Sequence, residues 1–277
     1  MDGTAAGKTS ESAHLMLITP ERVFYAGLLG RPRRRCSGAF HVYVAIKGGL
    51  RLAPEGERES HGELLVAPPY LAHTVVSDDR TVICVTLEPE TVRLGALDEL
   101  TKRLSGPDQA FFVDRIRAAY ARLPTCGFGD DITSAAFDPM FFGEALPARA
   151  LDSRVRRAIA QITSFFGEPV TAASCAATAG LSQSRFLHLF KEETGISFRS
   201  FRAWKRARHL LHFANQDINL AHLAQDIGYP DSTHFSHSIR RFYGLKPRAI
   251  FSGSRDLAIY SSGRTEADNS AWTQEAS

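Results

Sequence analysis

The sequence predicts an α+β protein of two domains, in which a small antiparallel β-barrel or sandwich with a helical hairpin precedes an all-helical domain. Up to Leu87, short apolar stretches are separated by Gly and Pro, which is typical of strands and turns. From Thr91 onward, apolar residues recur at helical spacing. One helix-turn-helix pattern also occurs twice between Ala176 and Leu245. A chain of 277 residues with 44% hydrophobic content is long enough to form two cores.

The N-terminal part begins with a polar lead, residues 1–14, which is expected to be disordered and lacks the apolar core of a secretion signal. The N-terminal domain is expected over residues 15–123. Its predicted strands are Phe40–Ile46, Leu50–Leu52, Leu64–Ala67, His73–Val76 and Thr81–Leu87. Residues 91–123 have the spacing of two amphipathic helices, whose apolar stripe forms a homodimer interface or packs on its own barrel.

The remaining chain divides into a linker, a helical domain and a tail. Residues 124–150 are rich in Gly, Asp and aromatics and are expected to be a partly ordered linker. Residues 151–251 are helical in period. Within them, residues 198–213 contain no Gly or Pro, which predicts one rigid helix that fixes the spacing of the two motifs. Residues 252–277 are polar and aperiodic, so a disordered tail is expected.

The two copies of the motif share one geometry. Ala176 and Ala224 let the first helix approach its neighbour closely, and Gly180 and Gly228, four residues later, supply the tight turn. A polar or capping residue then opens the second helix. The side chains expected inside are Phe186, Leu189 and Phe190 in the first copy and Phe235, Ile239 and Phe242 in the second.

The opposite face of each second helix is expected to be exposed and to bind DNA. Its residues are Gln183, Ser184, Leu187, His188 and Lys191 in the first copy and Ser232, Thr233, Ser236, His237, Arg240 and Arg241 in the second. Short polar side chains and imidazoles suit base edges in a major groove. Residues 151–250 carry fourteen Lys and Arg against seven Asp and Glu, which favours a polyanionic partner.

Individual roles follow from position on the helix. His188 and His237 are expected to contact base edges, with a solvated surface histidine as the alternative. Lys191, Arg240 and Arg241 are expected to neutralise phosphates. Leu187 either contacts a thymine methyl group or packs against the next helix.

Residues 151–251 resemble the DNA-binding domain of AraC/XylS-type transcription regulators. The matching segments are Leu181-Ser182-x-Ser184-x-Phe186, Leu189-Phe190-Lys191-x-Glu193-Thr194-Gly195, Ile227-Gly228-Tyr229, Phe235-Ser236 and Phe242-Tyr243-Gly244-Leu245-x-Pro247. The resemblance implies that both second helices enter successive major grooves of promoter DNA, with RNA polymerase as a further partner. Residues 171–175 depart from the family by lacking an acidic, Leu-rich start, and His188 and His237 stand where Arg is commoner.

The segment Gly62-x5-Pro68-x-Tyr70-x2-His73 is similar to the second conserved motif of cupin barrels, with Tyr70 in place of a Gly and Ser77 in place of an Asn. The resemblance implies that the N-terminal domain is cupin-like and binds a small-molecule effector. His41, Tyr43 and His73 are expected to line its pocket. Because His41 and His73 alone do not complete a catalytic metal site, we expect no metal, no cofactor and no enzymatic activity.

The segment Arg31-Pro32-Arg33-Arg34-Arg35 places four cations on a short stretch before the first long strand. Guanidinium groups bind phosphates and carboxylates bidentately. Arg31-x3-Arg35 is similar to an arginine motif that holds cyclic dinucleotides, which makes Arg31, Arg33 and Arg35 candidates for an anionic effector. The alternatives are a solvated basic edge and an auxiliary DNA contact.

The sequence therefore predicts a DNA-binding transcription regulator, acting as a homodimer and controlled by a small molecule. The alternatives are a metal-dependent cupin enzyme with a DNA-binding appendage and a ligand-independent activator. Cys36, Cys84, Cys126 and Cys175 are scattered without a zinc or redox motif, so reduced thiols are expected. No apolar run approaches the roughly 18 residues of a membrane span, and a soluble cytoplasmic protein without a membrane partner is expected.

Overall fold

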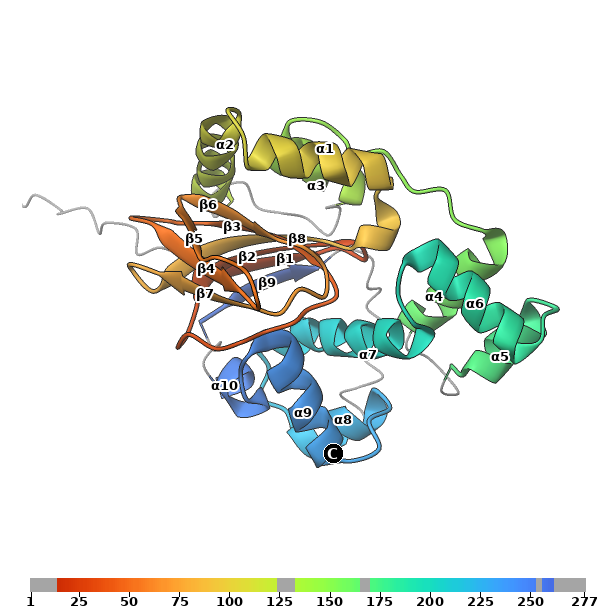
Figure 1. The fold of residues 1–277 in the computed structure, drawn as a ribbon. Coiled ribbons are helices and arrows are strands. Elements are labelled where there is room, and N and C mark those ends of the chain that lie inside the picture. The colour runs from red at the N-terminus through yellow and green to blue at the C-terminus, as the bar shows by residue number, and fades with distance from the viewer. Residues whose placement is uncertain (1–13, 124–132, 165–169, 253–255, 262–277) are drawn as a thin grey trace, which may run out of the picture.

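The N-terminal domain consists of two β-sheets covered on one side by helices (Figure 1). The computed structural model describes residues 14–123, 133–164, 170–252 and 256–261. The strands of this domain are β1 (Leu15–Ile18), β2 (Arg22–Leu28), β3 (Phe40–Val44), β4 (Leu50–Pro54), β5 (Ser60–Gly62), β6 (Leu64–Ala67), β7 (His73–Ser77) and β8 (Thr81–Leu87). The predictions of β6 and β8 are confirmed at both bounds.

The two sheets have the strand orders β6-β3-β8-β2-β1-β9 and β5-β4-β7. Every ladder within the set of strands from β1 to β8 is antiparallel, as predicted. The sheets stay open: among the described strands no ladder joins one sheet to the other, so the domain is not a closed barrel. An isolated bridge between Arg35 and His73 ties the loop before β3 to the smaller sheet.

The predicted helical hairpin is confirmed as α1 (Leu94–Leu104) and α2 (Gln109–Arg122), which follow the 3-10 turn η1 (Pro89–Thr91). Its apolar stripe, including Leu100 and Phe112, belongs to the same core as the large sheet. Most of the apolar stripe of α1 and α2 is therefore buried against the N-terminal domain itself. Leu94 and Phe111 still lie at the surface, with 55% and 50% of their area exposed.

The predicted linker contains a helix, α3 (Ser134–Phe142), which packs against α2 and on the large sheet. Phe141 stacks on Phe24 of β2 with ring centroids 4.8 Å apart. Asp138 accepts hydrogen bonds from Nε and Nη2 of the buried Arg22 at 2.7 and 3.0 Å. These contacts make residues 134–142 part of the N-terminal core. Pro139 interrupts the helical pattern of the segment, which is why the sequence conceals the helix.

The C-terminal domain is entirely helical up to Ser252 in its described part (Figure 1). Its helices are α4 (Ser153–Ser164), α5 (Ala172–Thr178), α6 (Gln183–Thr194), α7 (Phe198–His209), α8 (Leu220–Asp226), α9 (Ser232–Tyr243) and α10 (Pro247–Ser252). The predicted single helix over residues 198–213 is α-helical only to His209 and tightens into the 3-10 turn η2 (Leu210–Phe213). Phe166, whose helical spacing with Val155, Ile159 and Ile162 predicts a place on the buried face of the first helix, lies outside the described residues.

The predicted disordered tail is wrong for residues 258–261. They form β9 (Ala258–Ser261), which pairs in parallel with β1 at the edge of the large sheet. The adjoining Leu257 is buried in a cluster with Met16, Ile18 and Val23, so apolar burial fixes this segment. The rest of the tail and the predicted disordered lead before His14 lie outside the described residues.

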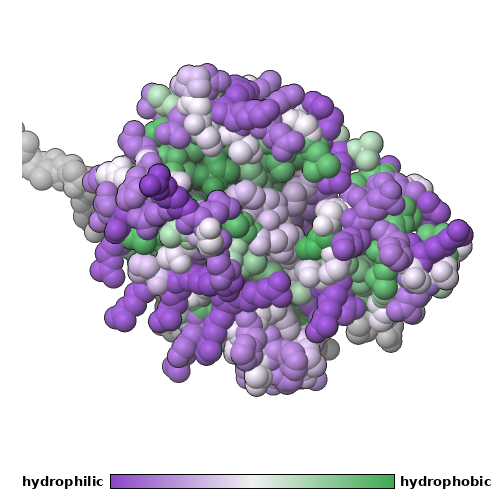
Figure 2. All heavy atoms as spheres, viewed as in Figure 1, coloured by the Kyte–Doolittle hydropathy of each residue, from purple (hydrophilic) through white to green (hydrophobic). Residues whose placement is uncertain are grey.

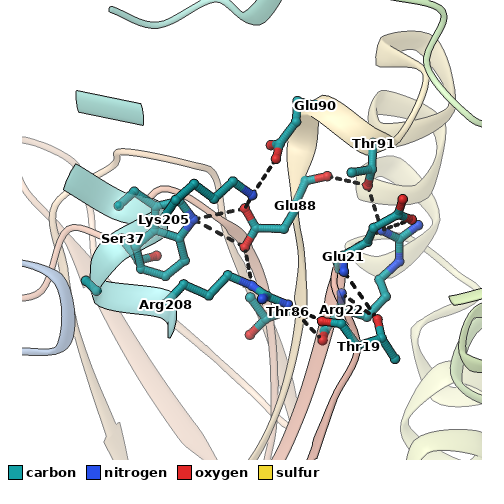
Figure 3. Close-up of polar contacts among 12 residues, drawn as sticks. Thr19, Glu21, Arg22, Ser37, Thr86, Glu88, Glu90, Thr91, Lys205 and Arg208 are labelled. Atoms are coloured by element: carbon teal, nitrogen blue, oxygen red, sulfur yellow. Dashed lines mark hydrogen bonds and ion pairs between the residues drawn. The ribbon is translucent and has the colours of Figure 1, made fainter. Parts of the chain in front are cut away.

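The two domains meet around Glu88, which follows β8 (Figure 3). Its carboxylate pairs with Lys205 and Arg208 of α7, with 2.9 Å between Arg208 Nε and Glu88 Oε1. Trp204 donates its indole N–H to the same carboxylate at 3.0 Å. Glu90 pairs with Lys205 at 2.5 Å. All four charged side chains are at most 8% exposed, so this ion cluster is sealed between the domains.

The ion cluster perturbs both carboxyl groups. Burial raises the pKa of Glu88, but the charges of Lys205 and Arg208 outweigh burial and hold its pKa below the ordinary value. Burial also raises the pKa of Glu90. The charge of Lys205 lowers this pKa by less than burial raises it, so the pKa of Glu90 lies above its ordinary value. Arg208 also donates through Nη2 to the backbone carbonyl oxygens of Thr19 and Arg22. The cluster therefore fastens α7 to the first hairpin of the large sheet.

We predict that Glu88→Ala lowers the free energy of unfolding by about 3–5 kcal/mol, because it leaves buried cations without their principal carboxylate. Glu55→Ala is the matched control. It breaks the Arg34–Glu55 pair, in which both side chains are 62% exposed, and should cost about 0–1 kcal/mol. Urea denaturation of both variants measures the difference. Equal losses would show that the buried cluster contributes no more than a surface pair.

Candidate nucleic-acid interface

Each helix-turn-helix unit is built from a short helix, a glycine turn and a longer helix. Gly180 and Gly228 adopt φ angles of +65° and +79° between the two helices of their units. Ser182 caps α6 by accepting from Arg185 N, and Asp231 caps α9 by accepting from Thr233 N and His234 N at 2.8 Å. The two turns therefore share a left-handed glycine and a capping side chain, as the sequence pattern predicts, although the second turn is one residue longer.

The buried faces of α6 and α9 are as predicted, apart from one residue. Phe186 and Phe190 are fully enclosed in a cluster with Phe198 and Phe201 of α7. Phe235, Ile239 and Phe242 lie in a second cluster with Trp204 of α7. Leu189 is only half-buried. Because α7 supplies residues to both clusters, the two units share one helix as their common support.

The opposite faces of both helices are open to solvent. Nine of the predicted DNA-contact residues are exposed: Gln183, Ser184, His188, Lys191, Ser232, Thr233, His237, Arg240 and Arg241. Ser236 is half-buried. Leu187 is also half-buried and packs against the first cluster, which favours packing over contact with a thymine methyl group. Each helix thus presents one polar face that carries short side chains, an imidazole and cations.

Two exposed residues at matching positions were not among the predicted contacts. Arg185 lies in the first turn of α6 and His234 in the first turn of α9. His234 Nδ1 lies 2.7 Å from Asp231 Oδ2, which orients the imidazole beside the start of the helix. Because each precedes a buried Phe, their position in the repeat could have identified them.

The predicted effector residues separate into an interior group and an exterior group. Tyr43 donates its hydroxyl to His73 Nε2 at 3.0 Å, and His73 Nδ1 lies 2.9 Å from Leu71 O. His41 lies beside Tyr43 with ring centroids 5.5 Å apart and contacts Ser37. Arg31 and Arg33 are exposed. The structure therefore brings His41, Tyr43 and His73 together and leaves Arg31 and Arg33 apart from them.

Arg35 belongs to the interior group. Its Nε and Nη2 atoms are enclosed and make no hydrogen bond within the part of the chain that the structure describes. Its charge lowers the pKa values of His41 and His73, adding to the larger effect of burial. Buried guanidinium nitrogens without a hydrogen-bond acceptor are energetically costly in a folded protein.

Burial keeps both histidines of the interior group neutral. The pKa of His41 falls well below 6.5, and that of His73 falls to about 4. Within the described ranges, no three His, Cys, Asp or Glu side chains come close enough together to hold a metal ion. Cys36, Cys84 and Cys175 are free thiols, while Cys126 lies outside the described residues. None of the described helices is both long and apolar enough to cross a membrane.

Comparison with known proteins places the similarity mainly in the helical domain. Residues 175–252 match the family model of a helix-turn-helix domain. The transcriptional activator RhaS of Escherichia fergusonii is 29% identical over 160 residues, 53% of this chain and 56% of that protein. The arabinose operon regulatory protein of Salmonella typhimurium is 30% identical over 105 residues, 37% of each chain. The match thus spans about half or less of these relatives.

Similarity in three dimensions extends over both domains. An apo ToxT variant from Vibrio cholerae matches with a TM-score of 0.50 and 11% identity, over 84% of this chain and 97% of that one. ToxT bound to (E)-4-(8-methylnaphthalen-1-yl)but-3-enoic acid matches with a TM-score of 0.51 and 9% identity, over 84% of this chain and 98% of that one. At these identities the likeness concerns the two-domain fold alone.

We predict that acid destabilises the protein partly through His73. Its folded-state pKa of about 4 lies below the ordinary value of 6.5, so between these two pH values the unfolded chain binds a proton that the folded chain does not. The stabilisation is complete above pH 6.5 and is lost as the pH falls towards about 4. Its slope is about 1.4 kcal/mol per pH unit within this window.

The measurement is urea denaturation between pH 7.5 and 4, with His73→Asn as the comparison. The variant should lose less of its free energy of unfolding than the wild type over the same interval. Parallel pH profiles of the two proteins would show that His73 does not titrate between the folded and unfolded states.

Proposed function

We propose that this chain is a sequence-specific transcription regulator and that its helical domain is a DNA-binding domain of the AraC/XylS type. The observation that carries the proposal is the pair of capped, solvent-facing helices α6 and α9 on one supporting helix, α7. Two exposed polar faces with a shared support fit two segments of major groove on one duplex. Double-stranded promoter DNA is accordingly the principal partner.

The two faces are proposed to read different sequences. His188 of α6 and His237 of α9 occupy matching exposed positions and are assigned to base edges. Lys191 and Arg240, further along their helices, are assigned to phosphates. The half-buried Leu187 stands where α9 has Ser236, so the surroundings of the two histidines differ. An asymmetric operator is expected from this difference.

We also propose that the N-terminal domain binds a small-molecule effector at the interior group of Arg35, His41, Tyr43 and His73. The enclosed Nε and Nη2 atoms of Arg35, which have no acceptor among the described residues, support an effector with an anionic group. The effector then acts by binding with different affinity to homodimer arrangements that do and do not suit the operator spacing. Contact of the DNA-bound dimer with RNA polymerase completes the proposed regulatory function.

The effector proposal is tested by measuring affinity for a selected duplex, and dimer formation by sedimentation, with and without small carboxylates and cyclic dinucleotides. A ligand dependence that Arg35→Gln removes would support it. An affinity independent of every ligand, in a protein that stays monomeric, contradicts the mechanism and favours a ligand-independent regulator.

We predict that His237→Ala weakens binding to the selected duplex by about 1–3 kcal/mol and relaxes sequence choice at the contacted base. Binding to random DNA should change little. His222→Ala is the matched control, because this exposed imidazole lies on α8 and not on α9. Fluorescence anisotropy with both duplexes makes the comparison.

We predict the opposite pattern for Arg240→Ala. A lost phosphate contact should weaken binding to selected and random duplexes alike and reduce the slope of log affinity against log salt by about 0.9. The same anisotropy titrations, repeated at several salt concentrations, measure this slope. If His237→Ala and Arg240→Ala both affect the two duplexes equally, the division into base-reading and phosphate-binding residues is wrong.

A further inference from the structure

We propose that residues 31–34 of the N-terminal domain bind phosphates of the same DNA that α9 binds, beside the C-terminal end of that helix. The inference rests on the proposed DNA-binding function and extends its interface beyond the helical domain. It assigns a ligand class, the duplex backbone, to the arginine-rich segment.

The first step is the position of the segment. Cys36 donates its backbone N–H to Arg241 O in the last turn of α9 at 2.7 Å. A Cβ atom built on Gly244, the C-cap of α9, would lie 3.1 Å from Arg34 O and 3.2 Å from Arg33 Cβ. The loop before β3 therefore packs directly against the end of α9, closely enough that a side chain at residue 244 would require the loop to shift by a few tenths of an ångström.

The second step is the charge that this packing brings together. Arg31 and Arg33 are exposed, and no ion pair joins either of them to a carboxylate in the described part of the chain. Arg240, Arg241 and Lys246 are exposed on and just after α9. In Figure 2 hydrophilic side chains crowd the lower left of the molecule, where α9 and α10 meet the β-sheets in Figure 1. Because the arginine segment packs against the end of α9, exposed cations of the two domains lie on neighbouring segments.

The third step is the chemistry of the partner. Clustered exposed charges of one sign repel each other, and a polyanion that tracks along them removes this cost. Phosphates recur along each DNA strand every ~3.4 Å of helix axis. A duplex bound to α9 would therefore place several successive phosphates near the arginine segment. Arg34 already pairs with Glu55 at 2.6 Å, which leaves Arg31 and Arg33 as the principal contacts.

The segment fits a compact anion less well. A small dianion needs convergent guanidinium groups, but Arg35 has its Nε and Nη2 enclosed inside the domain while Arg31 is exposed. The two ends of the Arg31-x3-Arg35 motif therefore do not present their guanidinium groups on one solvent-facing surface. This arrangement favours an extended backbone over a cyclic dinucleotide as the partner of Arg31 and Arg33.

The fourth step is the rigidity of the contact. The ring centroids of Trp204 and Phe242 lie 5.4 Å apart, and Tyr243 donates its hydroxyl to Ala207 O at 3.0 Å, so α9 is fixed on α7. The ion cluster of Glu88 fixes α7 on the N-terminal domain. The arginine segment consequently stays beside α9 when α9 engages DNA.

The test compares two double variants of the full chain. Arg31→Gln with Arg33→Gln removes the proposed contacts. Arg93→Gln with Lys102→Gln is the charge-matched control, because both residues are exposed on or next to α1, on the helical side of the large sheet in Figure 1. Affinity for a duplex selected by the wild-type protein from a random library is measured across a series of salt concentrations.

We predict that the Arg31/Arg33 variant reduces the slope of log affinity against log salt by about 2, with the control unchanged. Between about 50 and about 200 mM salt, the wild type should therefore lose roughly tenfold more affinity than the variant. The preference for the selected duplex over random DNA should stay the same. Shortening the duplex at one of its two ends should abolish the difference in salt slope between wild type and variant. Shortening it at the other end should leave this difference unchanged.

The other outcomes separate the two proposals. A wild-type protein that binds no duplex at any salt concentration overturns the proposed function itself. Wild-type binding with the same salt slope in the Arg31/Arg33 variant overturns the further inference alone. Saturable binding of free cyclic dinucleotide that this variant abolishes, with an unchanged slope, would assign the segment to a small anionic ligand instead.

Discussion

The buried ion cluster between β8 and α7 is the constraint on which the arrangement of this protein depends. Glu88 faces two cations and an indole N–H at 1% side-chain exposure, so it cannot leave its partners without stranding charges away from water. The helix that carries these cations also supports both helix-turn-helix units. A change in the sheet that displaces Glu88 would therefore shift α7 and, with it, both α6 and α9.

The sequence predicts best those features whose signals are local. The turns at Gly180 and Gly228, the caps at Ser182 and Asp231 and the apolar spacing of α6 and α9 each depend on a few neighbouring residues. The exposed faces follow from the same spacing, which is why most of the predicted DNA-contact residues lie at the surface. Strands with clear turn residues at both ends, such as β6, are predicted for the same reason.

Features that depend on distant partners could not be predicted in this way. Glu88 and Lys205 are far apart in the chain, and nothing near either residue indicates the other. Arg35 and Arg31 look equivalent in the sequence, but the bridge between Arg35 and His73 carries only Arg35 into the domain. Leu257 and the residues after it offer only a short apolar stretch, whose burial depends on Met16 and Ile18 near the other end of the chain.

β9 follows the helical domain in the chain but pairs in parallel with β1 of the N-terminal domain. This pairing can therefore form only after the helical domain has been synthesised. Residues 15–18 leave the ribosome early, but their outer edge has no partner until residues 258–261 have followed the whole helical domain. During that interval the apolar strand Leu15–Ile18 is an open sheet edge, which is a template for aggregation. Closing this long loop should make the last strand among the slowest to dock. The nascent N-terminal domain should thus be most prone to aggregation while the helical domain is being made.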